Sequence, residues 1–387
     1  MTWKALPTTT FGLAVLAASG SCPDAHRHTE SVTLEPGAVA MAAPAEPIPT
    51  PTSESAAGEI RRAIENAVPV LLDDGDAWME GHAPFQDGAS CVSCHQVPYG
   101  VWALSEAARD GIVADAAAQA DLTRRAVDFI DSAGVGRPMS WSPMMLALVA
   151  TPEAPDLSSY VGYLLRTQRP AGHWEARGQF PEQRRELSET NAVATMFAMH
   201  ALWWYDREDD PVIAESLERG WSWVVERGPG SSTEWLLMRM KVSGIGDDWE
   251  ERARLRKRLM AQQNEDGGWG WNPAEESNAM STGQALWALW LEFKRDEVAT
   301  SLYCGPSEGW KTVLVEQAEV ARRGIAYLVT TQGDDGWWRV ASDLISERRD
   351  ESKDYVYDYW GTAWATIGLA RWLEPANEEG SDANSAL

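Results

Sequence analysis

The chain has 387 residues, of which 58 are Asp or Glu and 33 are Lys or Arg, so its formal net charge at pH 7 is −25. Because like charges repel, this balance excludes nucleic acid as a partner and excludes docking on anionic lipid through surface charge. It is compatible with a cationic or neutral partner. Without an N-terminal leader and linker, roughly 330 residues remain, enough for one large domain or two ordinary ones.

The first 21 residues have the pattern of a secretory signal peptide. Lys4 precedes a short apolar stretch at residues 11–18, and small residues come after it; this stretch is too short to span a membrane. We therefore expect an exported protein, periplasmic or at the cell surface. Cys22 is a candidate lipid anchor and the only membrane attachment that we expect. Ser19 stands where lipoprotein signals usually have leucine, and simple cleavage nearby is the alternative.

Both flanks of the predicted folded region have compositions typical of disorder. Residues 22–57 are rich in Ala, Pro, Thr, Ser and Glu and predict a flexible linker. Residues 376–387 predict a disordered acidic tail. The folded part is therefore expected at residues 58–375.

The most informative motif is Cys91-Val-Ser-Cys94-His95, in a connection that we place at residues 74–97. Cys-x-x-Cys-His is the attachment signature of a c-type haem. The two thiols form thioether bonds to the haem vinyl groups, and the histidine becomes the proximal ligand of the iron. We therefore predict one covalent haem c, held by Cys91 and Cys94, with its iron bound by His95.

Other uses of a cysteine pair fit the sequence less well. A zinc site needs a second Cys/His pair at matching spacing, and the remaining cysteines, Cys22 and Cys304, stand alone. A thioredoxin-like pair usually follows a strand, and no strand pattern precedes Cys91. A structural disulfide stays open as an alternative. Export supports the haem interpretation, because covalent haem attachment takes place outside the cytoplasm.

From residue 58 the chain predicts twelve helices in six consecutive pairs, with almost no strand alternation. The pairs are 59–73 with 98–110, 120–133 with 141–150, 156–168 with 190–205, 212–226 with 233–243, 248–263 with 280–294, and 313–331 with 359–374. First helices carry one charged face, and second helices are apolar nearly all round; the former cover a surface and the latter are buried. This alternation predicts an all-α fold of two concentric rings, an (α/α)6 toroid. An open solenoid of helical hairpins is the alternative.

A pattern Q-x3-G-x-W occurs three times, each time after the first helix of a pair. Its copies begin at Gln168, Gln263 and Gln332 and end at Trp174, Trp269 and Trp338. The glycine serves a tight turn. We expect the tryptophan to pack over the glutamine amide and to join that helix end to its neighbour.

These loops resemble the QW motifs of the squalene–hopene cyclase and prenyltransferase superfamily of α-toroids. The resemblance covers roughly residues 155–375 through its motifs, and residues 59–150 only through the helix pattern. It implies the fold more than an activity. The D-x-D-D acid of class II terpene cyclases is missing from the sequence, and Cys304 has no companions for the zinc site of protein prenyltransferases. Neither of these two activities is expected.

Because the haem motif lies in the same kind of connection as the QW loops, we expect the haem at the end of the toroid where the buried helices begin. The group on the sixth iron position decides between electron transfer and catalysis. That position is either open or filled by one of several candidates: Met139, Met144, Met145, His82, His173 and His200. The same end is expected to hold five polar residues, most of them helix caps: Glu189, Asn191, Asn278, Asp358 and Tyr359.

Three functions remain open. The first is an exported mono-haem c protein that transfers electrons to or from a redox partner protein. The second is a haem-dependent oxidoreductase that acts on a small apolar, terpenoid-like molecule in the toroid. The third is a non-redox, cyclase-like binding protein in which Cys91 and Cys94 serve structure.

Overall fold

The computed structural model describes residues 54–81, 97–133, 138–149, 156–176, 185–205, 210–245, 248–299, 308–341 and 351–373. Within these segments the chain forms twelve α-helices and no β-strand, and the β-pairing there is limited to one isolated bridge between Trp269 and Asn278. The helices are α1 (Glu54–Met79), α2 (Val97–Arg109), α3 (Ala116–Ala133), α4 (Pro138–Val149), α5 (Ser158–Thr167), α6 (Leu187–Tyr205), α7 (Pro211–Arg227), α8 (Thr233–Ile245), α9 (Trp249–Ala261), α10 (Ala279–Ala299), α11 (Glu308–Thr331) and α12 (Glu351–Trp372).

All six predicted helix pairs are present, and the differences lie at their ends. Helix α1 begins at Glu54, inside the segment expected as linker, and runs on to Met79. Helix α12 begins at Glu351, eight residues before its predicted start at 359. These extensions carry several charged residues, so the apolar periodicity that predicts a helix weakens before the helix ends. The connection between α1 and α2 is correspondingly shorter than expected.

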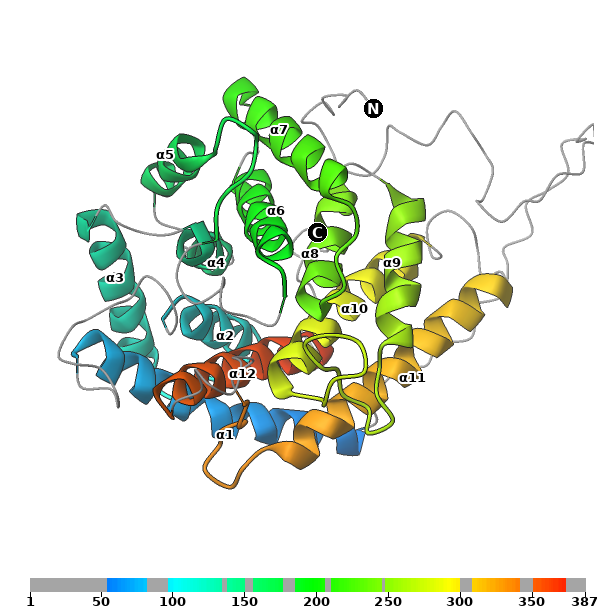
Figure 1. The fold of residues 1–387 in the computed structure, drawn as a ribbon. Helices are drawn as coiled ribbons and strands as arrows, with labels where there is room; N and C mark the ends of the chain where they lie inside the picture. The colour runs from blue at the N-terminus through cyan, green and yellow to red at the C-terminus, as the bar shows by residue number, and fades with distance from the viewer. Residues whose placement is uncertain are drawn as a thin grey trace, which may run out of the picture.

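The even-numbered helices form a closed inner ring. Helices α2, α4, α6, α8, α10 and α12 each contact the next, and α12 contacts α2. The odd-numbered helices lie outside them, with α3, α5, α7, α9 and α11 on the periphery (Figure 1). Helix α1 packs on both α12 and α2 and also contacts α11. The fold is therefore an (α/α)6 toroid, and the open solenoid is wrong.

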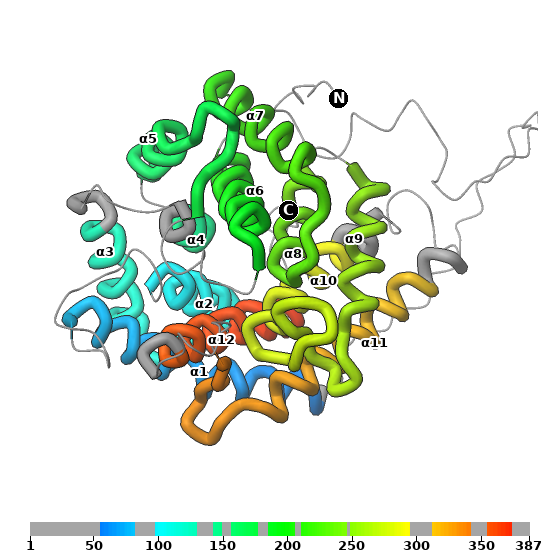
Figure 2. The backbone as a smooth tube through the Cα atoms, viewed as in Figure 1, coloured from blue at the N-terminus to red at the C-terminus, as the bar shows by residue number. Residues whose placement is uncertain are grey.

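The sequence of each helix explains the ring to which it belongs. In α7, an outer helix, the buried residues are Ile213, Ser216, Leu217, Gly220, Trp223 and Val224, which recur with helical spacing and form one face. In α6, an inner helix, residues 192–202 are all buried. The chain alternates between the two kinds, so the tube in Figure 2 passes from outside to inside and back along its length.

The three QW loops fasten neighbouring outer helices to each other. The Nε2 of Gln332 donates to the carbonyl of Gly336 (3.0 Å) in its own loop and to that of Ala63 (2.9 Å) in α1. The amides of Gln168 and Gln263 bond in the same way to Ser216 in α7 and to Val320 in α11. The glutamine therefore makes the join that we expected of the tryptophan.

The tryptophan of each loop instead links the outer helix of its own pair to the inner one. The Trp338 indole donates to the Leu328 carbonyl in α11 (2.8 Å), while its backbone N–H donates to the Thr362 hydroxyl in α12 (3.1 Å). The loop glycines Gly172, Gly267 and Gly336 all have positive φ, between 84° and 98°, which a side chain would disfavour. The repeat is thus a clasp with the same bonds in each copy.

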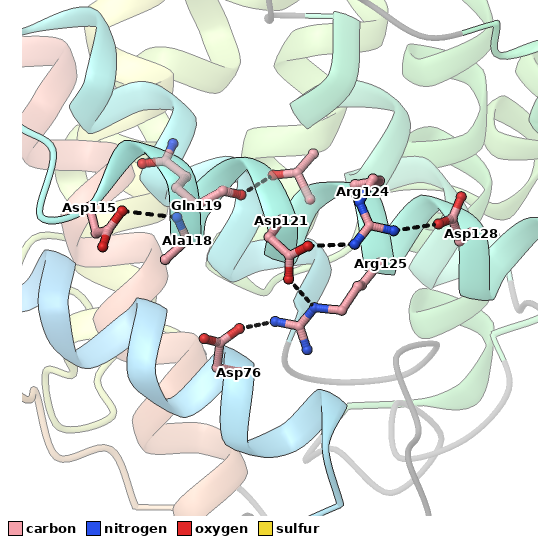
Figure 3. Close-up of polar contacts among 9 residues, drawn as sticks. Asp76, Asp115, Ala118, Gln119, Asp121, Arg124, Arg125 and Asp128 are labelled. Atoms are coloured by element: carbon pink, nitrogen blue, oxygen red, sulfur yellow. Dashed lines mark hydrogen bonds and ion pairs between the residues drawn. The ribbon is translucent and has the colours of Figure 1, made fainter.

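A chain of ion pairs joins α3 to the end of α1 that leads into the predicted haem loop (Figure 3). Arg125 pairs with Asp76 in α1 and with Asp121 in its own helix. Arg124 in turn bonds to Asp121 and to Asp128, the latter at 3.0 Å. These groups are partly exposed, so the chain of pairs orients the helices more than it stabilises them.

Candidate functional site

Cys91, Cys94 and His95, with His82, lie outside the described residues, as do Cys22 and Cys304. The described chain ends at Gly81 after α1 and resumes at Val97, the first residue of α2. This connection passes from an outer to an inner helix, as the QW loops do. The haem motif stays a prediction, and the structure describes the two helices that flank it in sequence.

Tyr359 of α12 holds those two helices together. Its hydroxyl donates to the carbonyl of Leu71 in α1 (3.2 Å) and lies against Gly100 in the first turn of α2. A Cβ atom on Gly100 would meet that hydroxyl oxygen at 1.9 Å. Burial raises the pKa of Tyr359 well above its ordinary value, with Asp74 and Asp76 adding to the effect, so the hydroxyl stays protonated and remains a donor.

Aromatic side chains from four inner helices meet across the ring. We call this the axial aromatic cluster; it comprises Tyr99 and Trp102 in α2, His200 in α6, Trp287 in α10, and Trp360 and Trp364 in α12. The Trp102 ring lies 5.5 Å from that of Trp287 and 5.2 Å from that of Trp364, measured between centroids. Helices α2 and α10 are not neighbours in the ring, so side chains that join them occupy its interior. The ring contacts between members of this cluster are edge-on or tilted, the arrangement that aromatic pairs prefer.

His200 is a neutral member of this cluster. Burial, followed by the charge of Lys241, lowers its pKa well below the ordinary 6.5. The indole N–H of Trp204 donates to its Nε2 at 3.2 Å. Nε2 is therefore an acceptor, and the one proton of the neutral ring resides on Nδ1.

A buried polar group lies beside the cluster, near the end where the inner helices begin. Arg185, which precedes α6, pairs with Glu234 of α8 at 2.7 Å, and their side chains are 4% and 1% exposed. Gln284 of α10 donates to the same carboxylate at 3.3 Å. Burial raises the pKa of Tyr99, and the negative charge of Glu234 raises it further while Arg185 opposes this. Helices α2 and α8 lie on opposite sides of the ring, so this group too is interior.

We expected most of the five polar residues at this end to cap helices, but Asn278 alone caps the start of its own helix, and the others mainly hold loops. Glu189 accepts bonds from Ser231 and Ser232 before α8, and Asn278 accepts from the N–H of Ser281 at the start of α10. Asn191 and Asp358 accept from the N–H groups of Ala176 and Val340. Tyr359 is the exception, since it joins helices. Sequence reasoning missed Arg185 and Glu234; a carboxylate near the start of a helix expected to be buried was the available signal.

The candidate distal ligands are spread over the molecule. Met144 and Met145 are fully buried in α4, and His200 is in the axial cluster. His173 lies in a QW loop, stacked on Trp223 of outer helix α7 at 4.5 Å, and burial lowers its pKa. Met139 lies in α4. The structure does not bring these candidates together into one site.

The other end of the ring carries a second buried ionic group. Glu106 of α2 accepts bonds from Trp102 (3.0 Å), Arg109 (3.2 Å) and Arg371 of α12 (2.5 Å). Burial raises the pKa of nearby Asp110 to about 6. Within the residues that the structure describes, no group of three or more His, Cys, Asp or Glu side chains is arranged to hold a metal ion. None of the helices in the described segments is long and apolar enough to cross a membrane.

No protein-family model matches the sequence, and no curated protein matches it. Several solved structures are similar to the fold of this chain. A variant of the type II terpene cyclase MstE from Scytonema, in complex with geranylgeranyl dihydroxybenzoate (substrate), has a TM-score of 0.52 at 10% identity, covering 84% of this chain and 100% of its own. A second MstE variant, in complex with merosterolic acid A (product), has the same TM-score and identity, covering 83% and 99%. A possible member of the GH105 family from Salmonella enterica has a TM-score of 0.48 at 12% identity, covering 82% and 94%.

At these identities the likeness concerns the fold. The chain has an α-toroid fold similar to that of the type II terpene cyclase MstE. This agrees with the resemblance of its QW loops, and those loops now have a physical role as clasps between helices. The comparisons leave the activity open.

Proposed function

We propose that this protein is an exported, mono-haem c-type electron-transfer protein on an α-toroid scaffold, with a redox partner protein. The observation that carries the proposal is the Cys91-Val-Ser-Cys94-His95 run in the connection that enters inner helix α2. Two thiols three positions apart, followed at once by an imidazole, are the donor set of a covalent haem. When bound, the haem supplies a one-electron couple.

The flanking helices support this assignment. His95 lies two positions before α2, and Tyr99, four positions after it, is buried among Trp360 and Trp364. A haem held by His95 would therefore be tethered to a helix whose first turn reaches the ring interior. Low polarity and limited solvent access around a haem are among the factors that set its potential.

The direct test is a pyridine haemochrome assay of the exported protein, together with spectra of the oxidised and reduced forms with and without CO. We expect one covalent haem per chain, low-spin in both states, and no CO complex. The Cys91→Ala/Cys94→Ala variant should carry no covalent haem. A haemochrome assay that finds no covalent haem in the wild-type chain contradicts the proposal. Fractionation of cells tests export and, through labelling with fatty acid, the anchor at Cys22.

A second candidate is a haem-dependent oxidoreductase acting on a small apolar molecule inside the ring. The observation that favours it is the Arg185–Glu234–Gln284 group beside the axial aromatic cluster, since buried polar groups next to an aromatic interior are typical of ligand sites. The similar fold of MstE, solved with a prenylated substrate, adds support. High-spin iron that binds CO favours this candidate over electron transfer. If covalent haem is missing, a non-redox, cyclase-like binding protein is the remaining candidate.

A further inference from the structure

Buried N–H groups in the axial aromatic cluster lack hydrogen-bond acceptors. In the part of the chain that the structure describes, neither the indole Nε1 of Trp287 nor that of Trp364 has a partner, although these side chains are only 4% and 0% exposed. The same holds for Nδ1 of His200, which is 1% exposed. A buried donor without an acceptor costs about 1–3 kcal/mol, so proteins seldom leave several together.

All three groups are donors. An indole nitrogen can only donate. His200 is neutral and already accepts from Trp204 through Nε2, so its Nδ1 carries the proton. What the three groups lack is therefore acceptors.

The three side chains adjoin one another. The Trp287 centroid lies 6.1 Å from that of Trp364 and 6.4 Å from that of His200. The ammonium of Lys241 lies 4.7 Å from the Trp287 ring centre and adds positive charge to this place. The carboxylate of Glu106 accepts from Trp102 and Arg371 instead.

A water molecule is a poor partner for these three N–H donors. It accepts from an N–H, but it brings two O–H donors that also need acceptors. A carbonyl or carboxylate oxygen accepts without donating. The aromatic walls meanwhile favour an apolar body attached to that oxygen.

We propose that the axial aromatic cluster binds an apolar molecule through a carbonyl or carboxylate oxygen, which accepts from Trp287 together with Trp364 or His200. The proposal deepens one part of the second candidate given above, the binding of a small apolar molecule inside the ring, and rests on that part alone. It does not depend on the haem. The bound molecule lies in the ring interior between α6, α10 and α12.

Calorimetric titration of the full exported chain with three probes tests the proposal. Acetylnaphthalene carries a carbonyl, naphthoate carries a carboxylate, and ethylnaphthalene matches acetylnaphthalene in size without an oxygen. We expect at least one oxygenated probe to bind about tenfold or more tightly than ethylnaphthalene, as one or two hydrogen bonds provide. The tighter of the two identifies the acceptor as neutral or charged.

Trp287→Phe keeps an aromatic ring and removes the N–H. It should weaken the oxygenated probe about tenfold and leave ethylnaphthalene unchanged. Trp223→Phe is the matched control, because Trp223 also has an unpartnered buried indole among the described residues but lies on outer helix α7. This control should bind like wild type. Circular dichroism of each variant confirms folding.

Equal affinity for all three probes, no binding of any probe, or an unchanged titration of Trp287→Phe overturns the proposal. The haemochrome assay is independent of these titrations. A chain that lacks covalent haem and still binds the oxygenated probe contradicts the electron-transfer proposal alone. A haem-bearing chain that binds no probe contradicts the axial site alone.

Discussion

The hydroxyl of Tyr359 occupies the space that a side chain at Gly100 would need. Tyr359 belongs to the last inner helix and Gly100 to the first, so this contact closes the inner ring next to the predicted haem loop. The same hydroxyl bonds to Leu71 in α1. One phenol thus sets the spacing of three helices.

Gly100→Ala should destabilise the protein. Alanine favours a helix by up to about 1 kcal/mol over glycine, but its Cβ would collide with a buried phenol, and overpacking typically costs about 1–3 kcal/mol. We expect a net loss in the free energy of unfolding, measured by urea titration. Gly58→Ala in α1 is the control, since a Cβ there meets nothing within 4 Å. It should be neutral or stabilising; equal effects of both variants would contradict the steric account.

Gln332→Ala should also lower stability, by about 1–3 kcal/mol, because the carbonyls of Ala63 and Gly336 lose their donor. Chemical denaturation monitored by circular dichroism gives the value. Glu316→Ala, on the exposed face of α11, the helix that precedes this loop, should change little. A loss no larger than that of Glu316→Ala would show that the clasp is dispensable.

Glu292→Ala should cost about 3–5 kcal/mol, because Arg252 of α9 is left as a buried cation without its partner. The double variant Arg252→Met/Glu292→Leu should recover most of the loss, since apolar residues of similar size avoid burying charge. The exposed pair Arg322–Glu319 provides the comparison, and Glu319→Ala should have little effect. Thermal unfolding of the four proteins distinguishes these outcomes.

Asp110 should make the protein less stable as pH rises from about 4 to about 6. Burial raises the pKa of its carboxyl from 3.8 to about 6, against the opposing effect of Arg109, so the folded state holds this proton more tightly than the unfolded state. The resulting stability is fully present below pH 3.8 and is lost as pH passes 6. The Asp110→Asn variant should lack this pH dependence, so the unfolding free energy of the wild type should fall relative to that of the variant across this pH range. Urea titrations at several pH values measure it, and parallel curves would contradict the assignment.

The order and pairing of the helices were predictable because each inner helix is apolar all round and each outer helix on one face only. The positions of Gln168, Gln263 and Gln332 were equally readable, because the repeat marks them. Their bonding was not, since the partner carbonyls of Ser216, Val320 and Ala63 lie one outer helix away in space and up to 269 positions away in sequence.

The axial site was beyond prediction for a different reason. An inner helix such as α10 is buried on every side, so periodicity does not reveal that Trp287 faces the ring interior while Leu286 accepts a bond from Trp372 in α12. Nor does the sequence reveal that Glu234 in α8 forms an ion pair with Arg185, which precedes α6. Only the rotation of each helix within the ring decides these contacts.

The bond from Gln332 to Ala63 also sets an order of events in biogenesis. The N-terminal helix α1 is made first, yet its partners in α11 and α12 are made last, with separations of 269 and 288 positions in the chain. Contacts between such distant positions form late, because a long loop must close first. During synthesis or export, the surfaces of α1 that pack on α11 and α12 therefore stay exposed until nearly the whole chain has emerged. A truncated chain that lacks α11 and α12 would expose the surfaces of α1 and α10 that these two helices cover.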